Sequence, residues 1–502
     1  MKKTTKTFLY IFAGLALLAI ILFALNNIAE KKLKEGIKEA SSQINLEYEK
    51  LEVNLLSRKA VLESPSFSID GKNFRAEKLS LNNIEILKYI QNKELEIGEV
   101  LLQSPNLQID QSKTSESSRK DSSSGFEENI LIKKLLVKDG TLALVENDSA
   151  DNSFFTNFSE LEISQFQIDS GTVKNTLPFN YENYTFKGDS LFYKLDSRHN
   201  ISTEEVNIRN GNSLIKAFRI IPVYGKQEFQ QHIPYEMDRF DLLIEEISLS
   251  DLKLEVTGDS LSIENPLTKI KNAHLEIYRD KLQPEDTRKK KMYSQMIREL
   301  PLRLRLDTIR VSDSYIKYEE LMDEGRSPGE VDFSNMNASI FNLTNHTEGY
   351  KGTDIDVKTR FMQEADLSVN WNFNIRNKAD RFYISGNMNH ISEDSMNRFL
   401  KPAMNVLAKG SIEDMAFNYS GNHTEATGDM KLVYKDFKVE VLRNDGTRKN
   451  KVLSALANLI MNNDAMSEDV NQKELEVTRD KTRSFWNYLW KMIQEGALKS
   501  FF

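Results

Sequence analysis

The chain has 502 residues, which is long enough for one large domain or for two to three ordinary ones. Its formal net charge is −8, with 67 basic and 75 acidic side chains, so no basic excess points to nucleic acid as a partner. The absence of cysteine excludes disulfides, thiolate metal sites, cysteine nucleophiles and a lipidated cysteine.

The first predicted element is an apolar helix near the N-terminus. Residues 8–25 contain no charged side chain, and this length is at the lower end of what a membrane-spanning helix needs. Lys2, Lys3 and Lys6 precede the run, so the positive-inside rule leaves the N-terminus in the cytoplasm. A cleaved signal peptide is the alternative, but the run is long for one and is followed by no good cleavage site. We therefore expect residues 1–30 to hold a single-pass anchor, made by Phe8, Leu9, Ile11, Phe12, Leu15, Leu17, Leu18, Ile20, Ile21, Leu22, Phe23 and Leu25.

Alternating apolar and polar residues, typical of half-buried strands, follow a charged stalk that begins at residue 31. Within residues 31–110, LEVNLLSRKAVLESPSFSID places apolar side chains at spacings of two. The pattern returns in LSLNNIEI, ELEIGEVLL, LPLRLRLDTIRV, ADLSVNWNFNI and RFYISGNMNHI. Gly, Asn, Asp and Ser, which favour tight turns, separate the runs. The sequence therefore predicts a mainly β protein.

An internal repeat supports this prediction. VLESPSFSID (61–70) and LLQSPNLQID (101–110) share Leu, Ser, Pro, Ile and Asp at matching positions. A looser unit of strand, polar turn and strand returns at 135–146, 247–258 and 309–320. Because a two-stranded unit cannot bury its apolar face alone, neighbouring units must lie beside it. We therefore expect a repeat β-sheet over residues 126–381.

Two other regions lack the strand pattern. Residues 111–125, QSKTSESSRKDSSSG, have no apolar periodicity and predict a disordered loop. Residues 443–502 predict a helical C-terminal region, because KVLSALANLIMNN (451–463) has apolar residues at i, i+3 and i+4.

The final residues, SFWNYLWKMIQEGALKSFF, predict an amphipathic helix rich in aromatic side chains. Apolar residues every third or fourth position form one face, which the two tryptophans widen. Such a helix is too short and too charged to span a membrane well, but its aromatic rings suit a membrane interface. The alternative is a helix that plugs the open end of the sheet. We expect an interfacial or groove-capping helix with the contact residues Phe485, Trp486, Leu489, Trp490, Met492 and Ile493.

Residues 188–191, Gly-Asp-Ser-Leu, spell the signature of the GDSL lipases and esterases, and Asp196 and His199 resemble the rest of their triad. Those enzymes place the serine between a strand and a helix, whereas alternating residues on both sides here predict strand, turn and strand. The same four letters return at 258–261, between two further alternating runs. Two copies of one catalytic serine make no chemical sense, whereas two copies of one turn suit a repeat protein.

Other signatures of chemistry are missing from the sequence. The six histidines are never closer together than 33 residues, and no His-Glu-x-x-His, P-loop or Gly-x-Gly-x-x-Gly occurs. We therefore expect no enzyme, no metal and no cofactor.

The order of these features resembles the AsmA-like family of bacterial envelope proteins. An anchor followed by LEVNLLSRKAVLESPSFSI is similar to the N-terminal region of that family. Residues 382–442 are similar to its C-terminal β region, where a helix ending near Pro402 precedes strands at Lys409-Gly410 and at Gly428-x-Met430-x-Leu432. The resemblance implies a long, curled, groove-forming sheet that accommodates lipid acyl chains. It also implies an inner-membrane protein with its bulk in the periplasm, which supports envelope lipid transport and outer-membrane homeostasis.

The strand pattern also limits how the sheet can bury its apolar residues. A sheet of alternating strands has one apolar face, and too few amphipathic helices are predicted to cover it. The sheet must therefore close on itself, stack, or curl around something apolar that is not protein. The resemblance to AsmA-like proteins implies the third arrangement, and with it the expected partners: phospholipid or another envelope lipid, a membrane, and other envelope proteins. No nucleic acid is expected. The alternative is a non-enzymatic structural or assembly factor for outer-membrane proteins, with an ordinary filled β core.

Overall fold

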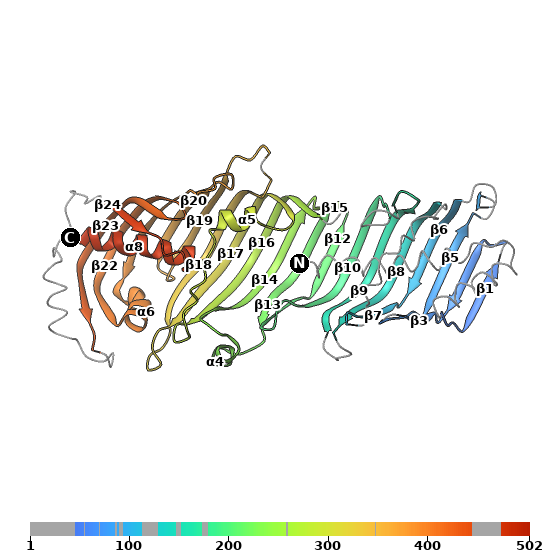
Figure 1. Ribbon diagram of the computed structural model, residues 1–502, viewed down its shortest axis with the longest axis horizontal. Coiled ribbons are helices and arrows are strands. Elements are labelled where there is room, and N and C mark those ends of the chain that lie inside the picture. Colours follow the sequence, from blue (N-terminus) through green and yellow to red (C-terminus); the bar gives the residue numbers. More distant parts are fainter. Residues whose placement is uncertain are drawn as a thin grey trace. The chain divides into compact units, whose positions relative to one another are not determined.

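The computed structural model describes residues 46–443 and 473–501, apart from gaps at 55, 70, 86–87, 90–93, 113–128, 147–151, 173–178, 258–259 and 347. Within these ranges, 24 strands form one large and mostly antiparallel sheet with few helices (Figure 1). The prediction of a mainly β protein is confirmed. The chain divides into two compact units. The first runs to Asp196 and includes Asn200–Ala217 and Asp251–Ser262, and the second comprises Ser197–His199, Phe218–Ser250 and the chain from Ile263 onward.

The strands before residue 223 are β1 (Lys50–Asn54), β2 (Lys59–Glu63), β3 (Ser66–Ile69), β4 (Lys72–Arg75), β5 (Lys78–Ile84), β6 (Glu94–Gln103), β7 (Asn106–Asp110), β8 (Asn129–Val145), β9 (Asn152–Ile168), β10 (Asn183–Lys194), β11 (His199–Thr203), β12 (Glu205–Arg209) and β13 (Asn212–Pro222). In the first unit β1, β2, β5 and β6 pair in that order, as do β3, β4 and β7. Both β6 and β7 pair in parallel with β8, which continues antiparallel through β9 to β10.

The sequence repeat corresponds to two bent strand pairs in the first unit. β2 leads into β3, and β6 leads into β7, through a Ser-Pro corner in which Ser64 and Ser104 adopt positive φ angles of 50° and 48°. The Ser64 N–H donates to the Glu77 carbonyl, and the Ser104 N–H donates to the Lys138 carbonyl. Proline follows each serine and has no N–H to leave unpaired. The corner therefore turns the strand without losing a sheet hydrogen bond.

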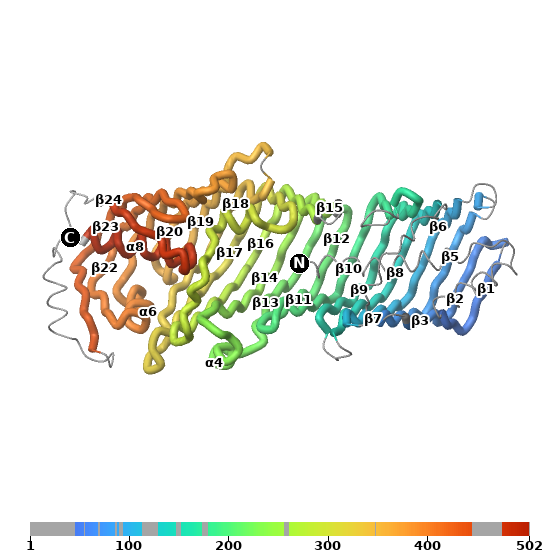
Figure 2. The backbone as a smooth tube through the Cα atoms, in the orientation of Figure 1, coloured from blue at the N-terminus to red at the C-terminus, as the bar shows by residue number. Residues whose placement is uncertain are grey.

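The remaining strands are β14 (Asp238–Ser250), β15 (Lys253–Thr257), β16 (Ser260–Asp280), β17 (Arg303–Leu321), β18 (Gly329–Thr344), β19 (Thr353–Phe361), β20 (Ala365–Phe373), β21 (Phe382–Ser392), β22 (Val406–Gly421), β23 (Glu425–Val441) and β24 (Lys473–Thr478). In the second unit β14 pairs with β16, and β17 to β24 pair antiparallel in chain order, as Figure 2 lets the reader follow. The helical elements of the second unit, within the residues that the structure describes, are α4 (Lys226–Phe229), the 3-10 helix η2 (Gln230–His232), α5 (Tyr293–Arg298), α6 (Glu393–Met404) and α8 (Phe485–Phe501).

Each unit has its own apolar core. In the first unit, alternate residues of β2, β5, β6, β8 and β9 meet, and Ile97, Val100, Ile132 and Leu135 are fully buried. In the second unit, the core joins β20 to β24 with α5 and α8. α8 lies across the sheet at β23 and β24, and its apolar side chains enter this core (Figure 1).

Several long strands contain residues with positive φ in their interior. We use the term corner residues for six of these: Asp139 in β8, Asn272 in β16, Asp313 in β17, Asn335 in β18, Gly410 in β22 and Asp436 in β23. Asn342 of β18, Gln165 of β9 and Ala217 of β13 also have positive φ. Asn, Asp and Gly tolerate this conformation best, which explains their presence within strands. In β17, β18 and β22 the corner coincides with a β-bulge that shifts the pairing register. The bulge bends the strand and increases its twist.

These corners correct one sequence prediction. Residues 135–146 and 309–320 were predicted to be strand, turn and strand, but 135–145 lie in the single bent strand β8 and 309–320 lie in the single bent strand β17. The Gly-Asp-Ser-Leu stretch at 188–191 likewise lies inside β10, where a bulge falls at Gly188. Near 247–258, in contrast, β14 ends at Ser250 and β15 begins at Lys253, as the turn prediction requires.

Other predictions concern the helices. The helix expected near Pro402 is α6, which continues to Met404 and ends where Asn405 adopts a positive φ angle. Residues 443–502 are not wholly helical, because β24 pairs with β23. The predicted anchor at 8–25, the serine-rich loop but for its first two residues, and the predicted helix at 451–463 lie outside the described residues. Among the described helices, none is long and apolar enough to cross a bilayer.

Candidate functional site

The C-terminal helix α8 presents two different faces. Phe485, Tyr488 and Met492 are almost completely buried in the second core, whereas Trp486 and Trp490 are 55% and 40% exposed. The tryptophans were predicted to widen the apolar face of the helix, but each follows or precedes a residue of that face, and one residue turns the side chain by about 100° around the helix axis. The two tryptophans therefore form a separate, outward stripe. Leu489 and Ile493 lie between the two faces and pack partly against the core.

Aromatic contacts attach the start of α8 to α5 and β20. The rings of Trp371 and Phe485 stack with centroids 4.8 Å apart and an interplanar angle of 9°. Trp486 Nε1 donates to the Tyr293 hydroxyl over 2.8 Å, and burial raises the pKa of Tyr293. Tyr293 also meets Trp371 edge-on. Tyr293 and Trp371 were not predicted from the sequence, because each lies far from α8 in the chain and has no local sequence pattern that marks it.

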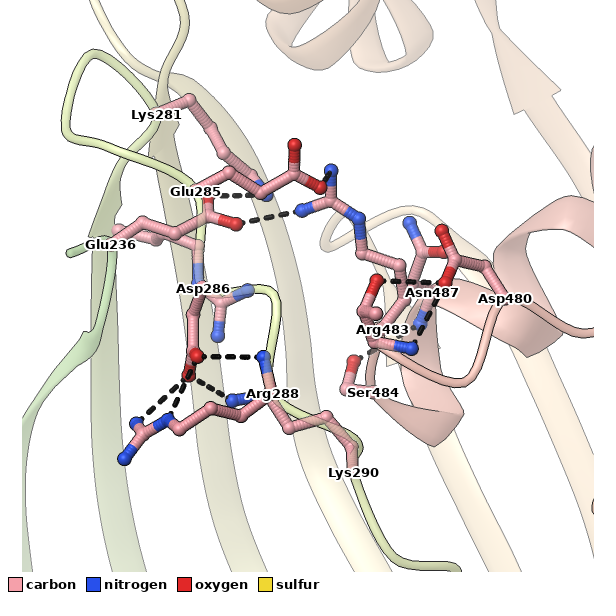
Figure 3. Close-up of polar contacts among 12 residues, drawn as sticks. Glu236, Lys281, Glu285, Asp286, Arg288, Lys290, Asp480, Arg483, Ser484 and Asn487 are labelled. Carbon is pink, nitrogen blue, oxygen red and sulfur yellow. Dashed lines mark hydrogen bonds and ion pairs between the residues drawn. The ribbon is translucent and has the colours of Figure 1, made fainter.

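An ion-pair network joins the segment before α8 to two loops of the second unit (Figure 3). The buried carboxylate of Glu236 accepts from Lys281 Nζ and from Arg483, each over 2.7 Å. Arg483 also pairs with Glu285. A buried carboxylate is costly unless it is paired, so the two cations make the burial of Glu236 possible. Glu236 and Arg483 are 247 residues apart in the chain, and their contact closes that loop.

A second carboxylate, Asp286, organises the basic loop beside this network. Arg288 donates to its two oxygens over 2.9 and 3.0 Å, and Lys290 also pairs with it (Figure 3). These donors, Arg288 above all, hold the pKa of Asp286 well below its usual range. The Arg288 guanidinium also lies 4.2 Å from the centre of the Tyr235 ring. The loop is therefore held in place while Arg288 itself remains solvent-exposed.

A partly uncovered apolar face lies on β14 and β16. The register pairs apolar residues directly across these two strands: Phe240 with Ile277, Leu242 with Leu275, and Ile244 with Ala273. Leu242, Leu275 and Ile277 are only half-buried, and Phe240 is exposed. Among the described residues, neither apolar core includes a side chain of β14, β16 or β17. Apolar surface of this kind is stabilised when it is removed from water.

Three residues of the hydrolase-like motifs, Ser190, His199 and Ser260, lie in strands of the sheet. Ser190 lies in β10, and its carbonyl accepts a hydrogen bond from Thr156 Oγ1 over 2.8 Å. His199 is buried, packs against Phe229 and Phe240, and accepts the Phe240 N–H at Nε2 over 3.3 Å. That nitrogen is therefore engaged by the backbone. Ser260 is the first residue of β16.

In the part of the chain that the structure describes, no group of three or more His, Asp or Glu side chains is placed to hold a metal ion. A scan of protein-family models and a search of curated proteins found nothing that matches the chain.

Proposed function

We propose that this chain binds and guides lipid acyl chains along the apolar face of β14 and β16. The observation that supports the proposal is the set of apolar pairs centred on Leu242 and Leu275, which lie outside both cores and remain half-buried. An acyl chain laid on this face gains about 0.8 kcal/mol for each CH₂ group it buries. Three successive apolar pairs across two strands suit an extended alkyl chain better than a ligand rich in polar groups.

The resemblance to AsmA-like envelope proteins supports the setting of this activity. We infer a bacterial inner-membrane protein with a cytoplasmic N-terminus, which supports envelope lipid transport and outer-membrane homeostasis. A C-terminal alkaline phosphatase fusion should then be active, and a fusion to a reporter that works only in the cytoplasm should be silent. The reverse pattern would place the sheet in the cytoplasm and contradict this topology.

Photocrosslinking tests the lipid contact directly. Neighbouring residues of a strand point to opposite faces, so Leu275 and His274 form a matched pair. Benzoylphenylalanine at Leu275 in the full chain should yield lipid adducts on irradiation of cells, detected by mass spectrometry of the purified protein. The same group at His274, whose ring lies against Tyr315 and near Glu276, should yield few.

The competing function predicts a different product. A structural or assembly factor for outer-membrane proteins would form no lipid adduct at Leu275 and would instead crosslink to a protein. Equal lipid labelling at Leu275 and His274 would indicate nonspecific contact, and it would also contradict a dedicated lipid-binding face.

A further inference from the structure

We propose that α5, α6 and α8, together with the basic loop before α5, form a surface that docks on an anionic lipid bilayer. This surface is defined by four exposed apolar side chains and the loop 288–291: Met296 on α5, Met404 on α6, and Trp486 and Trp490 on α8. The proposal concerns the outer faces of these helices, which are distinct from the sheet face proposed to hold acyl chains.

Direct contacts hold the three helices together. Trp486 hydrogen-bonds to Tyr293 at the start of α5, and the Trp490 ring meets Phe399 of α6 at a centroid distance of 5.6 Å. Each tryptophan therefore packs one edge on a neighbouring helix and leaves much of its ring in solvent. Figure 1 shows α8 with α5 and α6 near it, on the same unit of the chain. The exposed side chains are thus carried on helices that contact one another through α8.

Basic side chains lie next to this apolar surface. Four consecutive residues, Arg288 to Lys291, precede α5, and the side chains of Arg288 and Lys291 are 63% and 55% exposed. Lys289 is also exposed, as is Lys401, three residues before Met404 on α6. Asp286 and Glu299 pair with part of this charge. The structure shows no acidic partner for Lys289 or Lys401 among the described residues.

The combination of residue types favours a bilayer over a protein partner. Tryptophan is enriched at the membrane–water boundary, because its ring is apolar and its Nε1 is polar. Lysine and arginine beside it gain about 1 kcal/mol each from an anionic membrane surface. The whole chain carries a net charge of −8, so a local basic loop is needed for any approach to anionic lipid.

Tryptophan fluorescence of the full chain tests this proposal at the surface itself. The chain has three tryptophans, Trp371, Trp486 and Trp490, so a Trp371→Phe variant retains only the two on the surface. This variant is reconstituted in vesicles of brominated phosphatidylcholine, with or without phosphatidylglycerol. The proposed N-terminal anchor would hold the chain in both kinds of vesicle alike, so a difference in quenching between them reports contact by the helices. We expect the brominated lipid to quench the fluorescence more strongly when phosphatidylglycerol is present, and 1 M salt to reverse the gain.

Charge reversals complete the test. Lys289→Glu and Lys401→Glu, in the Trp371→Phe background, should each lower the docked population about fivefold or more. Lys358→Glu, at an exposed lysine of β19, is the matched control and should leave quenching unchanged. The proposal would be overturned if quenching were absent or were the same with and without phosphatidylglycerol. It would also be overturned if Lys358→Glu reduced quenching as much as the two surface variants. Crosslinking at Leu275 should persist in both surface variants, so failure of docking is separable from failure of lipid binding.

Discussion

Gly386 and Gly428 in the second unit lie directly opposite aromatic rings across the sheet. Gly386 faces Phe417 between β21 and β22, and Gly428 faces Tyr419 between β22 and β23. The two rings stack with centroids 5.0 Å apart, and the Tyr419 hydroxyl donates to the Met492 carbonyl of α8. The missing side chains of the glycines give the rings their space. Gly428 thus leaves room for the ring of Tyr419, which hydrogen-bonds to the C-terminal helix α8.

Gly428→Ala should therefore destabilise the second unit. A Cβ at this position would lie 2.0 Å from the backbone oxygen of Asn418, which cannot move without disturbing the sheet. We expect a loss of about 1–3 kcal/mol in the free energy of unfolding, measured by denaturant titration. Gly225→Ala is the control, because its Cβ would meet no atom within 4 Å. Equal stability of the two variants would show that the sheet relaxes around the new methyl group.

The contribution of Asp286 to the stability of the protein depends on pH. Its pKa is lowered in the folded protein by Arg288 and Lys290, so its ionised form contributes stability above the unfolded pKa of about 3.9. That contribution is lost as the pH falls through the lower, folded pKa. Asp286→Asn should therefore cost about 1 kcal/mol at pH 7, after allowance for solvent screening.

The difference in stability between wild type and Asp286→Asn should shrink below about pH 4, where the carboxylate of the unfolded chain is already protonated. Denaturant titrations of both proteins at a series of pH values measure it. A difference that stays constant down to pH 2 would mean that Asp286 acts by packing and not by charge.

At the scale of single elements, α8 combines a core helix with an exposed aromatic stripe. Met492→Ala should lower the free energy of unfolding by about 2–5 kcal/mol, because the side chain is fully buried beside Tyr488. Leu498→Ala, on an exposed part of the same helix, should change it by less than about 0.5 kcal/mol. Chemical denaturation followed by far-ultraviolet circular dichroism compares the two. Similar effects would contradict the burial of only one helix face.

The strands show what the sequence can and cannot predict. Alternation of apolar residues predicted strands such as β17 and β20, because a half-buried strand exposes every second side chain. The same pattern could not show whether Asp313 ends a strand or bends it, since Asp favours a positive φ in turns and in bulges alike. The tryptophans of α8 were found from their helical spacing. Glu236 and Lys281 were not, because only the folded chain brings them to Arg483.

At the scale of the whole molecule, the two apolar cores are distinct. Ile132 is fully buried in the first core and Met430 in the second, and no residue belongs to both clusters. Alanine at either position removes buried apolar volume and should cost about 2–5 kcal/mol within its own unit. We expect two unfolding transitions in denaturant, with Ile132→Ala lowering one midpoint and Met430→Ala the other. A single transition shifted by both variants would show that the units unfold as one.

The corner residues have a consequence for how the strands align as the chain folds. Sliding one strand by two residues past its neighbour keeps every apolar side chain on its proper face, so hydrophobicity alone does not penalise the error. The corner does. Asp313 of β17 lies beside the bulge at Asn335 of β18, and a slide by two would separate the two bends or move the bend onto Val311 or Tyr315. A bulky or β-branched residue in that conformation costs about 1–2 kcal/mol. Each corner residue therefore favours the correct register of its strand and disfavours a register shifted by two residues.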